Sequence, residues 1–107
     1  MKKNENFCPV RDVLSKVGDK WSVLVLYSLQ EGGVLRFSEL QRTIPDLSQK
    51  MLTQTLRRLE AMRLIGRSVY AEVPPRVEYR LTELGASLMT HLNPLIGWAL
   101  DNRAQWQ

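Results

Sequence analysis

The apolar residues of the N-terminal third recur at the spacing of two amphipathic helices. The first stripe consists of Val10, Val13, Leu14 and Val17, and the second, expected to be buried, consists of Trp21, Leu24, Val25 and Leu29. Cys8–Pro9 is expected to start the first helix, because proline at the first helical position loses no hydrogen bond. Gly18 is expected to end that helix, Asp19 to cap the second, and Gly32–Gly33 to stop it.

A short strand and a short helix are predicted next. Residues 34–37 are too few for a helix and too apolar for a plain loop, so we interpret them as a small strand. Ser38, followed three residues later by Gln41, matches a capping box that opens a helix through about Ile44.

A turn at Pro45–Asp46–Leu47 then leads into a longer helix, from Ser48 to Met62. Its apolar stripe, expected to be buried, is Leu52, Leu56, Leu59 and Met62. Ser48 is a good N-cap, because its hydroxyl accepts a hydrogen bond from a free amide of the first turn. Two short helices joined by about three residues form a helix-turn-helix.

The opposite face of the second of these helices carries donors and cations without a carboxylate. Its residues are Lys50, Thr53, Gln54 and Arg57. Such a face suits a polyanion, and the free amides at a helix start favour a phosphate nearby. The alternative is an ordinary amphipathic helix whose polar side faces only water.

After Met62 the pattern changes from helical to alternating. Residues 67–73 and 77–81 are rich in β-branched and aromatic side chains, with Val77, Tyr79 and Leu81 on one face of the second run. Pro74–Pro75–Arg76 is predicted to form a stiff tip that carries a cation. A two-stranded hairpin directly after a helix-turn-helix is the wing of a winged helix, and a purely structural hairpin is the alternative.

The last segment is predicted to be an apolar helix that Thr82 caps. Leu84, Leu88, Leu92, Leu95 and Ala99 keep helical spacing, and Pro94 must either kink the helix or restart it with Asn93 as a new N-cap. One small core does not cover this much apolar surface. We therefore predict a dimerisation helix, assisted by the first helix, with packing into a monomer's own core as the alternative. The expected interface is Val10, Leu88, Leu92, Leu95 and Trp98.

These elements predict a single domain over residues 1–107, of mainly α class with a small β-hairpin wing (α+β). Its winged-helix core is expected over about 8–82 and its C-terminal dimerisation helix over 83–106, with N- and C-terminal helices forming the dimer. The net charge is +4. The positive charge is concentrated in residues 41–80, a segment that contains eight basic and four acidic residues. This distribution favours an acidic partner.

Candidate chemistry is sparse. The chain has one cysteine, Cys8, and one histidine, His91, so we expect no metal site, no cofactor and no enzyme activity. No apolar run approaches the roughly 20 residues of a membrane span, and the N-terminus lacks a signal-peptide core. A soluble, cytoplasmic protein is expected.

Three stretches of the chain resemble the HxlR-type winged-helix transcriptional regulators, relatives of the MarR group. They are Cys8–Pro9–Val10 with Gly18–Asp19–Lys20–Trp21, then Leu47–Ser48–Gln49–Lys50–Met51–Leu52–Thr53, and Glu72–Val73–Pro74–Pro75–Arg76–Val77–Glu78–Tyr79 with Leu81–Thr82. The resemblance extends from Cys8 to about Trp98. It implies a homodimer that binds a partly palindromic operator, with half-sites roughly 34–36 Å apart or at a multiple of that distance.

Within that family picture, our hypothesis divides the site residues by role. Gln49, Lys50, Thr53 and Gln54 lie near the start of the recognition helix, where base edges are reached, with Ser48 as its cap. Phosphate or minor-groove contacts are expected from Arg57 on the helix and from Arg36, Pro75 and Arg76 around the wing.

Cys8 has two open interpretations, an inert thiol or a sensor of oxidants and electrophiles. Arg11, Lys2 and Lys3 are near it in sequence and favour a thiolate. With one thiol per chain, oxidation gives an intersubunit disulfide, a mixed disulfide or an adduct.

Three classes of function are thus compared. The favoured one is a DNA-binding transcriptional regulator, a repressor, with a small-molecule or electrophile effector. A winged helix used only for protein–protein contact would tolerate an acidic recognition face, and a thiol oxidoreductase would need a second cysteine.

Overall fold

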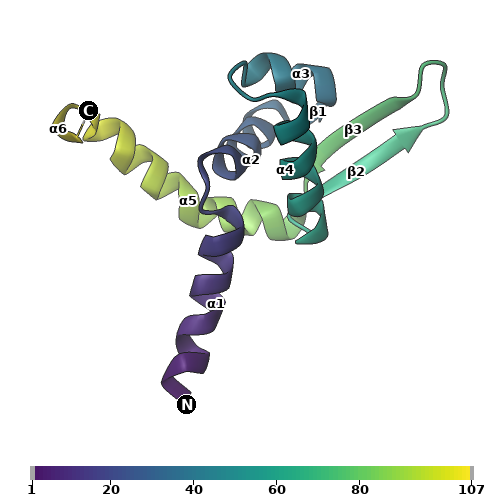
Figure 1. Cartoon of the computed structure of the whole chain (residues 1–107). Coiled ribbons are helices and arrows are strands. Elements are labelled where there is room, and N and C mark those ends of the chain that lie inside the picture. Colours follow the sequence, from purple (N-terminus) through teal and green to yellow (C-terminus); the bar gives the residue numbers. More distant parts are fainter. Residues whose placement is uncertain (1, 107) are drawn as a thin grey trace.

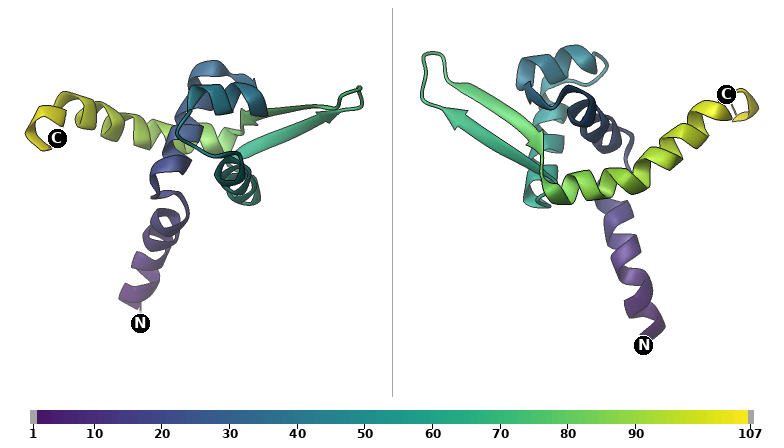
Figure 2. Two further views of the ribbon diagram at one scale, coloured as in Figure 1. Left: turned by 45° about the horizontal axis from the view of Figure 1, so that its top comes forward. Right: turned by 180° about the vertical axis from the view of Figure 1, so that it is seen from behind.

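The computed structural model describes the backbone of residues 2–106 and the side chains of residues 9–106. The helices are α1 (Lys2–Val17), α2 (Lys20–Gly32), α3 (Phe37–Thr43), α4 (Gln49–Ala61), α5 (Glu83–Asp101) and α6 (Arg103–Trp106), and the strands are β1 (Val34–Arg36), β2 (Ile65–Tyr70) and β3 (Arg76–Leu81). Helices α2, α3 and α4 gather beside the base of the sheet, while α1, the far half of α5 and the β2–β3 hairpin project in three directions (Figure 1). The views in Figure 2 show the same three projections. The fold is a winged helix-turn-helix, as predicted.

Helix α1 begins earlier than predicted. It starts at Lys2, so Pro9 lies within it and Cys8–Pro9 does not mark its start. Proline removes one amide donor, and the residues before it include no glycine or β-branched side chain, so they continue the helix. The predicted end is confirmed, because the Gly18 amide closes the last turn on the Leu14 carbonyl at 2.8 Å.

Helix α2 has the predicted cap and stop but a different buried face. Asp19 Oδ2 accepts hydrogen bonds from the Trp21 and Ser22 amides, and Gly33 has a φ of +80° that favours glycine. The prediction that Leu24 is buried is wrong, since 43% of it is exposed. Leu26 is buried instead, because the buried stripe that runs through Val25 and Leu29 continues toward Ser22 and Leu26 rather than toward Leu24.

Helix α3 starts one residue before the predicted cap. Strand β1 ends at Arg36, and Phe37, predicted to be in the strand, is the first residue of α3. The Arg36 amide donates to Glu39 Oε1 at 2.8 Å, which is the hydrogen bond that the third helical residue of a capping box accepts from the N-cap amide. The pair that forms it is Arg36 and Glu39, and not the predicted Ser38 and Gln41. Phe37 packs against the core, and this tertiary contact sets the helix start.

The sheet has three antiparallel strands in the order β1-β3-β2. The predicted hairpin is present, with Ile65 paired to Leu81 and Tyr70 to Arg76, but two of its bounds were wrong. Strand β2 covers 65–70 rather than 67–73, because Ile65 is buried in the core, and Arg76, predicted in the tip, is the first residue of β3. Strand β1 adds to the other edge of β3, with Leu35 paired to Tyr79. This pairing was not predicted, and it ties the start of the helix-turn-helix to the wing.

One hydrophobic cluster joins the helices to the sheet. Val77, Tyr79 and Leu81 face it from β3, as the alternation predicted. Its buried members are Val17, Val25, Leu26, Leu29, Leu40, Ile44, Leu47, Leu52, Leu56, Leu59, Leu64, Ile65, Tyr79 and Met89. The cluster fixes α4 on the body of the domain with its polar face outward.

Helix α5 runs through Pro94 without a break. Thr82 caps it as predicted, since its Oγ1 accepts from the Gly85 amide at 3.0 Å. Asn93 does not cap a restarted helix, because its side-chain amide exchanges two hydrogen bonds, of 3.0 and 2.9 Å, with Gln30 of α2. The helix bends part-way along its length (Figure 1), as a proline that lacks its amide donor allows. Among residues 2–106, no helix has the length and hydropathy to cross a membrane.

Candidate nucleic-acid interface

Helix α4 is held at its start by a local cap and along its length by the core. Ser48 Oγ accepts a hydrogen bond from the Met51 amide at 3.1 Å, which confirms the predicted N-cap. Leu52, Leu56 and Leu59 are buried, and Met62, at the C-cap, is partly buried. The predicted stripe is therefore the face that α4 packs inward, and its opposite face is available to a partner.

All six residues predicted for the recognition helix line one shallow depression. They are Ser48, Gln49, Lys50, Thr53, Gln54 and Arg57. Lys50, Gln54 and Arg57 are exposed, whereas Thr53 is partly buried and its hydroxyl donates to the Gln49 carbonyl at 2.9 Å. No carboxylate among residues 9–106 lines this depression, and the six residues that line it present donors and positive charge.

The residues predicted for the wing and backbone contacts also come together. Arg36, Pro75 and Arg76 line a second depression with Phe37, Ser38 and Val77. The pairing of β1 with β3 brings Arg36 opposite Glu78 and so places it beside the tip of the hairpin. Residues some forty positions apart in sequence therefore share one surface.

Arg76 is engaged within the wing itself. Its Nη2 lies 3.3 Å from Glu72 Oε2, and its Nε lies 3.5 Å from Glu78 Oε2 but makes no hydrogen bond. Its guanidinium carbon stands 4.2 Å from the centre of the Tyr70 ring. The sequence predicted a cation at this position but not the two carboxylates that offset its charge.

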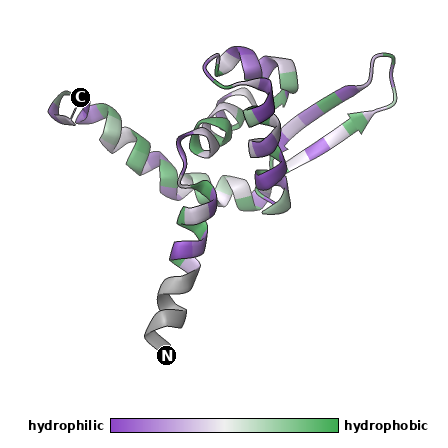
Figure 3. Cartoon of the chain, viewed as in Figure 1, coloured by the Kyte–Doolittle hydropathy of each residue, from purple (hydrophilic) through white to green (hydrophobic). Residues whose placement is uncertain are grey.

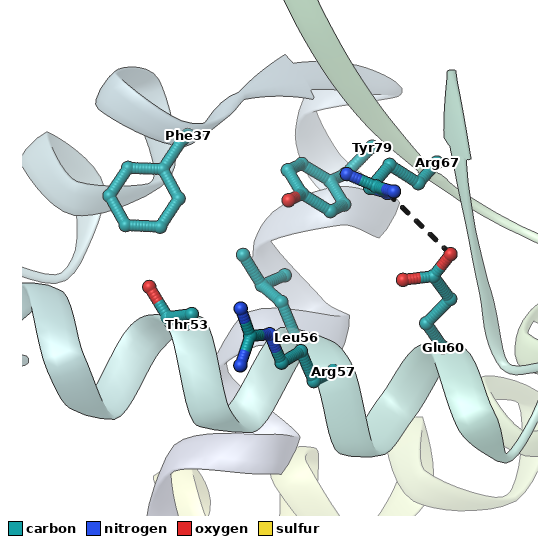
Figure 4. Close-up of a pocket in the computed structure, with 7 residues that line it drawn as sticks. All are labelled: Phe37, Thr53, Leu56, Arg57, Glu60, Arg67 and Tyr79. Carbon is teal, nitrogen blue, oxygen red and sulfur yellow. Dashed lines mark ion pairs between the residues drawn. The ribbon is translucent and has the colours of Figure 1, made fainter. Parts of the chain in front are cut away.

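In addition to these two depressions, a cleft of about 260 Å³ lies between α4 and the sheet (Figure 4). It is lined by Phe37, Thr53, Leu56, Arg57, Glu60, Arg67 and Tyr79. Arg67 Nε lies 3.7 Å from Glu60 Oε2, and each of these two side chains is almost half exposed. Burial raises the pKa of the Tyr79 hydroxyl, although the Arg67 cation opposes that shift. Sequence reasoning missed Glu60 and Arg67, although Glu60 follows Arg57 by three residues and so shares its side of the helix.

Arg58, next to the exposed Arg57, serves the fold. Its Nε donates to the Lys16 carbonyl at 3.0 Å, and its Nη2 donates to Asp19 Oδ1 at 3.2 Å and Ser22 Oγ at 2.9 Å. Burial would raise the pKa of Asp19, but hydrogen bonds from Ser22 and the Arg58 charge outweigh it, and the pKa is lowered. This network ties α4 to the junction of α1 and α2.

The residues predicted for the dimer interface divide into two groups. Val10, Leu95 and Trp98 are more than half exposed on the two helical arms, which are α1 and the part of α5 after Pro94. Leu88 and Leu92 are partly buried against the monomer's own core. The side chain of Cys8 lies outside the residues whose side chains the structure describes.

A family model described as HxlR-like helix-turn-helix matches residues 16–107, which include helix α4, the wing and all of α5 but only the last two residues of α1. The chain belongs to this family. HxlR-like proteins are DNA-binding transcriptional regulators of the helix-turn-helix type, and not enzymes. The family resemblance that the sequence motifs carry is thereby confirmed.

Individual HxlR-like relatives agree with this assignment. An uncharacterized HTH-type transcriptional regulator of Methanothermobacter thermautotrophicus is 51% identical over 98 residues, which cover 92% of this chain and 74% of the relative. The reduced form of the redox regulator HypR superposes with a TM-score of 0.83 at 41% identity, covering 89% of this chain and 93% of HypR. The reduced form of the transcriptional regulator YodB from B. subtilis gives a TM-score of 0.73 at 37% identity, covering 83% and 86%.

Proposed function

We propose that the protein is a homodimeric, sequence-specific transcriptional repressor that places α4 in the major groove of its operator. The observation that carries this proposal is the single depression formed by six polar or cationic residues on the outward face of α4. Gln side chains pair with adenine and Lys with guanine, so Gln49, Lys50, Thr53 and Gln54 are assigned to base edges. Arg57, Arg36 and Arg76 are assigned to phosphates or the minor groove, with Pro75 in the tip next to Arg76. With DNA as its partner, the protein acts in the cytoplasm.

The two helical arms support the homodimer. A compact domain of this length has a radius of gyration of about 13 Å, whereas this chain has one of 15.5 Å. Leu14, Leu95 and Trp98 are each more than half exposed on the arms. Hydrophobic residues recur along α5 beyond the core, while α4 carries hydrophilic residues on its outward side (Figure 3). A second copy packed along α1 and α5 would cover this apolar surface.

The test compares two substitutions on α4 by fluorescence anisotropy, with duplex DNA from the region flanking the gene and with random duplexes. Gln54→Ala should lower the preference for the flanking sequence by about 1–3 kcal/mol per lost base contact. Arg57→Ala should weaken binding to all duplexes alike and reduce the salt slope by about one. The assignment of roles is wrong if both variants lose the same affinity on every duplex.

We further propose that Cys8 makes DNA binding responsive to oxidants or electrophiles. The likeness to HypR, a redox regulator, favours this function over an inert thiol. Cys8 is the only cysteine in the chain, so an oxidant such as diamide would take two electrons and two protons from two thiols, one in each subunit or one from a small thiol. Diamide should change operator affinity in wild type and leave Cys8→Ser unaffected. An equal response in both proteins would refute thiol sensing and leave the DNA-binding proposal intact.

A further inference from the structure

The cleft between α4 and the sheet has a cation on each wall. Arg57 rises from α4, and Arg67 reaches in from β2 on the opposite side (Figure 4). Thr53 lies on the α4 wall near Arg57, Phe37 lines the cleft from the start of α3, and Tyr79 lines it from the sheet (Figure 4). Among the residues whose side chains the structure describes, Glu60 is the one carboxylate that lines the cleft.

The geometry of duplex DNA indicates which part of the duplex, its sugar-phosphate backbone, would lie over this cleft. One sugar-phosphate strand separates each major groove from the adjacent minor groove. If α4 occupies the major groove and the hairpin reaches toward the neighbouring minor groove, that strand must pass between α4 and the β2–β3 hairpin. The cleft is the space between these elements.

We propose that the cleft binds a backbone phosphate of this strand, with Arg67 as a phosphate contact opposite Arg57. The inference rests on the proposed DNA-binding function and adds to it a site on the inner wall of the wing. The volume of about 260 Å³ is several times the ~30 Å³ that a water molecule occupies, so a phosphate group fits. The Tyr79 hydroxyl is protonated, so it can donate a hydrogen bond to an anion in the cleft.

Glu60 has a defined part in this proposal. It holds Arg67 toward α4 in the free protein through a contact of 3.7 Å, which is long for a hydrogen bond. Because both side chains are almost half exposed, the pair is weak and exchanges readily. A phosphate entering the cleft takes over Arg67 and also meets repulsion from the Glu60 carboxylate. Glu60 therefore lowers the affinity for DNA.

The first experiment compares Arg67→Gln with Arg80→Gln. Arg80 is exposed, and on β3 it alternates with Tyr79 and so points to the opposite face, where it donates to Ser68 Oγ at 2.8 Å. Both variants lose one charge from the sheet. Anisotropy with a random-sequence duplex between about 50 and 200 mM salt should show affinity about 3–10-fold lower for Arg67→Gln, with a salt slope reduced by about one. Arg80→Gln should bind as wild type does.

The second variant, Glu60→Gln, is expected to change the affinity for DNA in the opposite direction. Removing its carboxylate should raise the affinity for the same duplex about 2–5-fold, with circular dichroism melts verifying that every variant folds. Unchanged or weaker binding by Glu60→Gln, or equal losses in Arg67→Gln and Arg80→Gln, would overturn the phosphate site. Wild-type protein without affinity for any duplex would instead refute the proposed function itself.

Discussion

Asp19 makes the stability of the fold depend on pH, because its carboxylate both caps α2 and contacts Arg58. Its pKa is lowered below the ordinary value of 3.8. A lowered pKa in the folded state means that the unfolded chain binds the proton more tightly. The stabilisation is therefore complete above the unfolded pKa and is lost as the pH falls below about 3.8 through the folded pKa.

Asp19→Asn should retain the cap, since asparagine is also a good N-cap, while it removes this titration. We expect the difference in urea-unfolding free energy between wild type and Asp19→Asn to shrink as the pH is lowered from 6 toward 3. A difference that stays constant over that range would show that the Asp19 carboxylate does not contribute through its charge.

Arg76, at the start of β3 next to the wing tip, has two acidic neighbours that reduce its effect on DNA. Arg76→Ala should weaken binding to all duplexes alike, by less than Arg57→Ala, because Glu72 and Glu78 already offset its charge. Glu72→Gln should strengthen binding by up to about fivefold, the range that an exposed ion pair of up to 1 kcal/mol allows. Anisotropy on random duplexes measures both changes. A larger loss for Arg76→Ala than for Arg57→Ala would contradict this ranking.

At the scale of elements, two adjacent arginines of α4 have separate roles. Arg58 bonds to the last turn of α1 and the first turn of α2, whereas Arg57 lines the outward depression. Arg58→Ala should lower the unfolding free energy by about 1–3 kcal/mol, because it removes charged hydrogen bonds that join three helices.

Arg57→Ala is the matched control, since it should leave stability within about 0.5 kcal/mol and lower DNA affinity instead. Thermal melts and anisotropy on the same two proteins test the separation. If Arg57→Ala destabilises as much as Arg58→Ala, the outward arginine also supports the fold and the division is wrong.

For the molecule as a whole, we expect the two helical arms to form the interface of the proposed dimer. Trp98 is 58% exposed on α5. Trp98→Glu should convert the proposed dimer to a monomer, because it places a charge in a dry interface. Light scattering after size exclusion measures the mass. Val69→Glu, at an equally exposed apolar residue on the wing, should keep the dimer. A monomeric wild type would refute the dimer, and a dimeric Trp98→Glu would exclude Trp98 from its interface.

Local signals in the sequence predicted the features that depend on near neighbours. The Ser48, Asp19 and Thr82 caps each act within three residues, and the helical period of Leu52, Leu56 and Leu59 identifies one side of a single helix. The polar face of α4 follows directly from that period. The grouping of the Ser48 cap with five α4 residues in one depression was therefore predictable from the sequence.

Local propensity failed where tertiary contacts compete with it. Packing of Phe37 moved the start of α3 away from Ser38, and the bonds between Asn93 and Gln30 occupy the side chain expected to cap a restarted helix. Leu24 is exposed because packing against the core determines which side of α2 is buried, and the helical period alone does not.

The capped, amphipathic helix α4 and the hairpin that follows it can be predicted from the chain alone, because caps and periodicity involve residues a few positions apart. The use of the cations depends on how the elements pack in three dimensions. Arg58 is bound to the α1–α2 junction, Arg76 is offset by two carboxylates, and Arg67 faces Arg57 across a cleft. The contacts of Arg58 and Arg67 form only when separate elements pack together. The contacts of Arg76 depend on the conformation of the turn before β3. The spacing of residues along the sequence does not specify either arrangement.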